Sequence, residues 1–172
     1  VDGARGTGQV RRLDLVVFVN GLPLGVLELK NPSDPEADVW KAYAQIQTYK
    51  QDLPTLFAYN AVVVGSDDVE ARIGSLTAPR SRFAYWRTVD GERLAPGSSQ
   101  PLEVLITGVF HKERFTDLIR HFVFFEGSGS KVSKILGGYH QFHAVRVAVE
   151  KTRTAIGEKG DRRVGVVWHT QG

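Results

Sequence analysis

The stretch LDLVVFVNGLPLGVLELK, residues 13–30, decides the fold of this chain. Its two apolar, partly β-branched halves predict two strands, and the Asn-Gly pair between them predicts a hairpin turn because both residues tolerate positive φ. The second half is almost continuously apolar, which is typical of a strand covered on both faces by helices. Three charges nevertheless interrupt the hairpin: Asp14 opens the first strand, and Glu28 and Lys30 close the second.

These charges should converge on one patch at the end of a sheet. Glu28 and Lys30 are two residues apart and share a face, and folding the hairpin sets Asp14 within roughly 5 Å of that position. Two neighbouring carboxylates repel unless a cation lies between them, and Mg²⁺ prefers one or two carboxylates plus water and phosphate oxygens. A metal ion and an adjacent lysine are what phosphodiester hydrolysis needs. The alternative is an ordinary Glu–Lys pair on a surface hairpin, worth at most about 1 kcal/mol.

The remaining elements follow from hydrophobic periodicity and turn residues. After the hairpin, Ser33 or Asp34 should cap a helix that runs to about Gln51, and Gln45 and Tyr49 share one side of it because they are four residues apart. Buried or alternating patterns then predict strands at 60–66, 70–77, 83–88, 123–125, 131–135 and 164–168. Helices are predicted at 102–109, where a strand is the alternative, and at 112–122 and 139–156.

Composition narrows the class of protein. The chain has 172 residues, of which 42% are hydrophobic and 24% charged, enough for one core with a small appendage. It has no cysteine, which excludes a disulfide scaffold or thiolate metal site and suits a reducing cytoplasm. No apolar run approaches the length of a membrane span. The net charge of +3 permits a nucleic-acid partner, and the absence of any methionine suggests a piece of a longer protein.

Several motifs resemble those of one known family. FVNGLPL (18–24), ELKNP (28–32) and AQIQTY (44–49) are similar to the nuclease core of the PD-(D/E)xK superfamily, specifically the restriction (HsdR) subunits of Type I restriction–modification enzymes. Further stretches resemble the same family in order along the chain: LFAYN (56–60), RFAYW (82–86), YHQFHAV (139–145) and VVWHTQG (166–172). The resemblance therefore covers nearly the whole chain.

The resemblance implies roles for five residues. Asp14 and Glu28 would be metal ligands, Lys30 the catalytic lysine, and Gln45 and Tyr49, as the family's QxxxY motif, would support the site or contact DNA. The family often has proline before the first acid, where this chain has leucine. It also has an upstream helix and strand with a further acidic residue, which we expect this chain to lack.

The resemblance also implies how the chain is divided. Residues 1–130 would form an α/β, restriction-endonuclease-like domain whose mixed sheet is flanked by helices. Residues 131–172 would form a linker helix and the first strand of a helicase-like, RecA-type ATPase domain. Gln141 resembles the glutamine that reads adenine in such motors, and Gly172 falls in the first half of a phosphate-binding loop. Because no Gly-Lys-Ser/Thr follows, we expect no ATP hydrolysis by this chain.

The function implied is Mg²⁺-dependent cleavage of double-stranded DNA by a Type I site-specific deoxyribonuclease in the cytoplasm. In the full-length protein it would be coupled to ATP-driven DNA translocation, with the methylation (HsdM) and specificity (HsdS) subunits as partners. Two alternatives stay open at this point. One is another PD-(D/E)xK nuclease, acting on modified DNA or in repair, and the other is a catalytically dead DNA-binding or docking domain.

Overall fold

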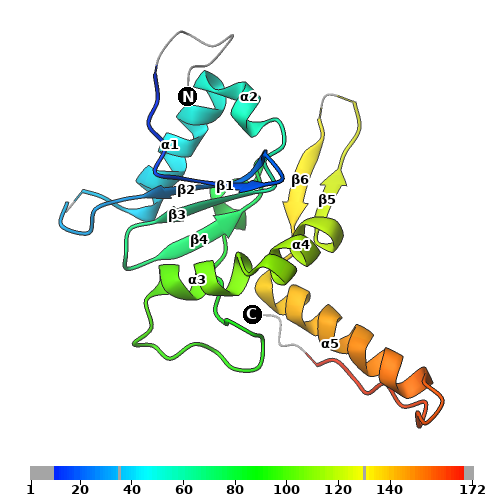
Figure 1. Ribbon diagram of the computed structural model, residues 1–172. Helices are drawn as coiled ribbons and strands as arrows, with labels where there is room; N and C mark the ends of the chain where they lie inside the picture. The colour runs from blue at the N-terminus through cyan, green and yellow to red at the C-terminus, as the bar shows by residue number, and fades with distance from the viewer. Residues whose placement is uncertain (1–9, 35, 130, 169–172) are drawn as a thin grey trace.

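A four-stranded mixed sheet organises the computed structural model, which describes residues 10–34, 36–129 and 131–168 (Figure 1). The strands are β1 (Leu15–Val19), β2 (Leu22–Leu29), β3 (Val62–Ser66) and β4 (Ala71–Gly74), in the order β1-β2-β3-β4. β1–β2 and β3–β4 are antiparallel, and β2–β3 is parallel. The predicted hairpin is confirmed, with positive φ at both Asn20 and Gly21 of its turn.

Helices cover both faces of this sheet (Figure 1). Helix α1 (Val39–Asp52) connects β2 to β3 and, with the short α2 (Pro54–Phe57), lies against one face. The exposed 3₁₀ turn η1 (Arg80–Arg82) follows β4. Helices α3 (Pro101–Val109) and α4 (Lys112–His121) and the start of α5 (Tyr139–Ile156) pack on the other. Successive strand residues point to opposite faces, so one set of β2 and β3 side chains, Val26 and Val63, meets α1 and the other, Leu27, Val62 and Val64, meets α3 and α4. The predicted α/β class with a flanked mixed sheet is confirmed.

A second hairpin, β5 (Val123–Glu126) with β6 (Ser133–Leu136), leads into α5. Phe142, in the first turn of that helix, is completely buried in the core cluster that includes α3 and α4, and the helix then extends away from the sheet (Figure 1). The division of the chain into two domains at residue 130 stays a prediction. Within the described residues, no helix is long and apolar enough to cross a membrane.

The start of α1 differs from the prediction. The helix is capped by Asp38, whose carboxylate accepts a hydrogen bond from the amide of Lys41 at 2.7 Å, and not by Ser33 or Asp34. Asp34 instead accepts from the amide of Glu36 at 3.0 Å in a local turn. Asp34 and Asp38 are both suitable N-cap residues, but only Asp38 directly precedes the apolar residues of α1 that contact the sheet.

Two predicted strands are absent from the described part of the chain. In residues 83–88 only Ala84 makes a bridge, to Ile73, because Phe83 and Trp86 are buried in clusters on opposite faces and the segment passes around the sheet edge. Residues 164–168 form no ladder with any described strand, and Trp168 is 87% exposed. The strand predicted at 164–168 was therefore wrong within the described residues, since an apolar run forms a strand only where neighbouring strands pair with it. Whether this segment begins an ATPase domain stays a prediction. The helix predicted at 139–156 is confirmed.

Candidate active site

The end of β2 carries the two charges that the sequence placed on one face. Glu28 is only 2% exposed, and the ammonium of Lys30 donates to its Oε1 at 2.8 Å. The backbone holds both residues in place, because the amide of Lys30 continues the parallel pairing by donating to the carbonyl of Ser66 at 2.8 Å. Lys30 itself keeps 19% of its side chain exposed, so the pair is buried at the carboxylate and open at the ammonium.

Asp14 lies directly before β1 and faces the same site. The register of β1 with β2 pairs Leu15 with Leu27, so one further step sets Asp14 opposite Glu28. Its Oδ2 accepts a hydrogen bond from the amide of Leu29 at 2.8 Å, which fixes the carboxylate against the end of β2. Asp14 is exposed, in contrast to Glu28. One exposed and one buried carboxylate therefore meet at this edge, as the hairpin geometry predicted.

Helix α1 brings Gln45 and Tyr49 to the same place. Lys30 donates to the amide oxygen of Gln45, the amide nitrogen of Gln45 donates to the hydroxyl of Tyr49, and that hydroxyl donates to the carbonyl of Arg12 at 2.9 Å. Tyr49 is 3% exposed, and burial raises its pKa. Its contacts are therefore with protein groups, and its geometry is that of a support which orients Gln45 and, through it, Lys30.

The electrostatics of Glu28 are dominated by its burial. Removal from water raises the pKa of this carboxyl, Lys30 opposes the rise, and the nearby charge of Asp14 adds to it, leaving the pKa above its ordinary value. Its second oxygen, Oε2, is buried and has no hydrogen-bond partner among the described residues. A buried carboxylate oxygen without a partner is costly unless a cation satisfies it.

This donor set fits a divalent ion. The described residues contain no group of three or more His, Cys, Asp and Glu side chains arranged to hold a metal. The free oxygen of Glu28 and the carboxylate of Asp14 nevertheless match Mg²⁺, which is commonly bound through one or two carboxylates and completes its shell with water and substrate oxygens. Asp14 and Glu28 are therefore the residues that could hold it.

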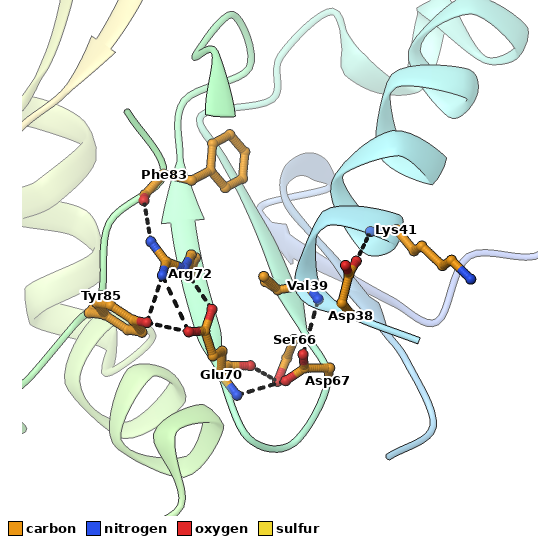
Figure 2. A network of polar contacts seen from close by, with 9 residues as sticks. All are labelled: Asp38, Val39, Lys41, Ser66, Asp67, Glu70, Arg72, Phe83 and Tyr85. Carbon is orange, nitrogen blue, oxygen red and sulfur yellow. Dashed lines mark hydrogen bonds and ion pairs between the residues drawn. The ribbon is translucent and has the colours of Figure 1, made fainter. Parts of the chain in front are cut away.

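Two residues that the sequence reasoning missed, Gly65 and Asp67, seat α1 against the sheet, and Figure 2 shows Asp67 beside Val39 of this helix. Gly65 is the register partner of Glu28 on β3, and a Cβ there would lie 3.2 Å from both the Cβ of Ala42 and the carbonyl oxygen of Val39. Asp67, just after β3, accepts from the amide of Val39 at 3.1 Å and from that of Glu70 at 2.7 Å. The available signal was a glycine inside the β-branched run VVVGS, followed at once by an aspartate.

The residues predicted for a partial ATP site are not brought to this centre. Gln141 is exposed in the first turn of α5, and its side-chain oxygen accepts from the amide of Gly138 at 2.9 Å. That contact caps the N-terminus of the helix, where four amides lack partners within the helix. Gly172 lies outside the described residues. A role for either in binding ATP stays a prediction.

Comparison with known proteins identifies relatives of this chain. Residues 4–82, which include Asp14, Glu28, Lys30, Gln45 and Tyr49, match the family described as Type I restriction enzyme R protein N terminus. The chain is also 45% identical over 168 residues to the Type I restriction enzyme HindI endonuclease subunit of Haemophilus influenzae, with 96% of the chain and 16% of that protein covered. The chain belongs to this R protein family.

Other R protein relatives align over almost the same span. The putative Type I restriction enzyme MjaIXP endonuclease subunit of Methanocaldococcus jannaschii is 33% identical, with 96% of the chain and 17% of the relative covered. The SauCOLORF180P endonuclease subunit of Staphylococcus aureus is 26% identical, with 94% and 16% covered. The chain thus spans about a sixth of the length of these curated R protein relatives.

Proposed function

We propose that this chain is the DNA-cleaving domain of a Type I restriction enzyme, with Asp14, Glu28 and Lys30 as its Mg²⁺-dependent centre. The observation that carries the proposal is the partnerless buried oxygen of Glu28, held beside Lys30 and facing Asp14. A surface ion pair leaves neither a buried carboxylate oxygen nor a second acid in register with it. Family membership supports the same chemistry, since its relatives are named endonuclease subunits.

The side chains of the chain itself would act as follows. Lys30 has three N–H donors, of which Glu28 and Gln45 take two, so the third can meet a phosphate oxygen or the attacking water. Gln45 and Tyr49 hold the ammonium in that direction. Asp14 and Glu28 would bind Mg²⁺, which when present acidifies water and offsets phosphate charge. The fixed charge of Lys30 adds electrostatic stabilisation where negative charge develops.

The activity of the whole protein extends this proposal, because the chain covers only a sixth of its relatives. We propose that the full-length protein couples cleavage of double-stranded DNA to ATP-driven translocation, with methylation and specificity subunits as partners. Gln141 and Gly172 would belong to its ATP site. A cytoplasmic location is proposed with it, in keeping with a chain free of cysteine.

Metal binding provides the direct test. Thermal unfolding of the chain is measured against Mg²⁺ and Mn²⁺, and plasmid cleavage is measured alongside. The parent should gain stability with either metal and cut DNA, whereas Asp14→Asn and Glu28→Gln should lose both responses. Glu103→Gln, which changes an exposed acid on α3, serves as the matched control and should behave as the parent. A parent that neither cleaves nor responds to millimolar metal contradicts the proposal.

A further inference from the structure

Arginines and aromatic rings alternate along the far side of α1 from the candidate site. The guanidinium of Arg80 lies 5.7 Å from the ring centroid of Trp40, and that of Arg72 lies 5.1 Å from the same ring. Arg72 also lies 4.1 Å from the ring of Tyr85, which Arg87 approaches at 5.3 Å. We name these five residues the arginine ladder. It joins α1, β4, η1 and the segment that follows them.

The middle rung of the ladder is structural. Arg72 donates to both oxygens of Glu70, at 2.9 and 3.4 Å, and to the hydroxyl of Tyr85 at 2.6 Å (Figure 2). A further bond reaches the carbonyl of Phe83 at 3.4 Å. These contacts lower the pKa of Glu70 and use the donors of Arg72, so this guanidinium has little left for a ligand.

The two end rungs differ from the middle one. Arg80 and Arg87 are exposed, and neither side chain has a hydrogen bond or ion pair within the described ranges. Stacking on a ring uses the face of a guanidinium and leaves its in-plane N–H donors free. It also orders a long side chain before any ligand arrives, which lowers the entropy cost of binding. The three arginines of the ladder, together with Glu70, which Arg72 contacts, carry a net charge of +2.

Arg72, the middle residue of the ladder, lies in the same row of the sheet as the candidate centre. The register pairs Glu28 with Gly65 and Gly65 with Arg72, and one step beyond Glu28 in the other direction lies Asp14. Strands are about 4.8 Å apart, which puts the backbones of Glu28 and Arg72 about 10 Å from each other. Because α1 packs on Gly65, between these two positions, the ladder and the candidate centre lie on either side of α1 on one face of the sheet.

We propose that Arg80 and Arg87 bind backbone phosphates of duplex DNA while another phosphate of the same duplex occupies the centre at Glu28. The choice of DNA as partner rests on the proposed function. Ordered guanidinium groups with free planar donors suit phosphate oxygens, and such contacts position a duplex without reading its sequence. The ladder would therefore set the direction in which DNA crosses this edge of the sheet.

Salt dependence of DNA binding tests the inference. Anisotropy of a labelled random-sequence duplex of about 30 base pairs is measured with the 172-residue chain in EDTA, so that neither metal nor cleavage is needed. For the double variant Arg80→Gln/Arg87→Gln, the slope of log Kd against log salt should shrink by about 1.8, and affinity near 0.1 M salt should fall roughly tenfold or more. Arg80→Lys/Arg87→Lys keeps both charges and should retain most of the slope.

A control of equal charge separates this effect from loss of net charge. Arg153→Gln/Arg163→Gln removes two exposed arginines at and beyond the end of α5 and should leave the slope unchanged. The inference would be overturned if the slope of log Kd against log salt were equal in Arg80→Gln/Arg87→Gln and Arg153→Gln/Arg163→Gln. It would also be overturned if the slope of Arg80→Gln/Arg87→Gln equalled that of the parent. Cleavage by the parent with such a result would leave the proposed centre standing. If DNA binding depends on the ladder but the parent chain does not cleave DNA, only the proposed catalytic centre is contradicted.

Discussion

Glu28 on β2 and Gly65 on β3 are register partners, so the buried carboxylate lies beside a residue that has no side chain. The missing Cβ lets the first turns of α1 approach the sheet next to the candidate site. The position of Gln45 over Lys30 therefore depends on a small residue on the neighbouring strand, since α1 carries Gln45.

Gly65→Ala should destabilise the chain by about 1–3 kcal/mol, because the new methyl group would press on Ala42 and on the carbonyl of Val39, both at 3.2 Å. Metal-dependent cleavage should fall by a larger factor than stability alone explains. Urea unfolding and cleavage rates measure the two effects. Gly97→Ala is the matched control, since nothing lies within 4 Å of its added Cβ, and its stability should change by no more than about 1 kcal/mol. Equal effects at the two glycines would contradict this account.

Lys30→Met should lower the free energy of unfolding by about 1–3 kcal/mol, because it leaves the buried Glu28 carboxylate without its cation. The partial exposure of Lys30 keeps the value below that of a completely buried pair. Adding Glu28→Gln to Lys30→Met should recover part of the loss, since no uncompensated charge remains. A double-mutant cycle at neutral pH measures the interaction free energy between the two side chains. An interaction free energy of zero would show that they do not interact.

The raised pKa of Glu28 predicts a pH dependence of stability. Between the ordinary glutamate pKa and the raised value, the folded chain binds more protons than the unfolded chain, so stability should fall as pH rises through this window. Glu28→Gln should flatten that part of the profile. Because a divalent ion needs the ionised carboxylate, stabilisation by Mn²⁺ should grow with pH over the same window. A metal response independent of pH there would argue against Glu28 as a ligand.

Tyr49→Phe separates support of the site from contact with DNA. Removing the buried hydroxyl breaks its bonds with Gln45 and with the carbonyl of Arg12, so Lys30 should lose its fixed direction. We expect kcat to fall about 10- to 100-fold, as for other residues behind a catalytic group, and the Kd for DNA and its salt slope to stay constant. A weakened Kd with unchanged kcat would instead make Tyr49 a DNA contact.

The hairpin, the shared side of Gln45 and Tyr49, and helix α5 could be predicted because each follows from local periodicity and turn chemistry. The start of α1 could not, since Asp34 and Asp38 both suit a cap and only packing chooses between them. The alignment of Glu28, Gly65 and Arg72 across three neighbouring strands could not be predicted from the sequence either. It depends on the parallel register of β2 with β3, which no short-range pattern specifies.

The seating of α1 also has a consequence for the order of assembly during synthesis. Asp14, Glu28, Lys30, Gln45 and Tyr49 are all made before Gly65 and Asp67, the residues that accept the helix onto the sheet. A nascent chain that has emerged only as far as α1 holds every residue of the proposed centre but lacks β3, the strand on which the first turns of α1 pack. We therefore expect the proposed centre to stay incomplete on the ribosome until β3 has emerged.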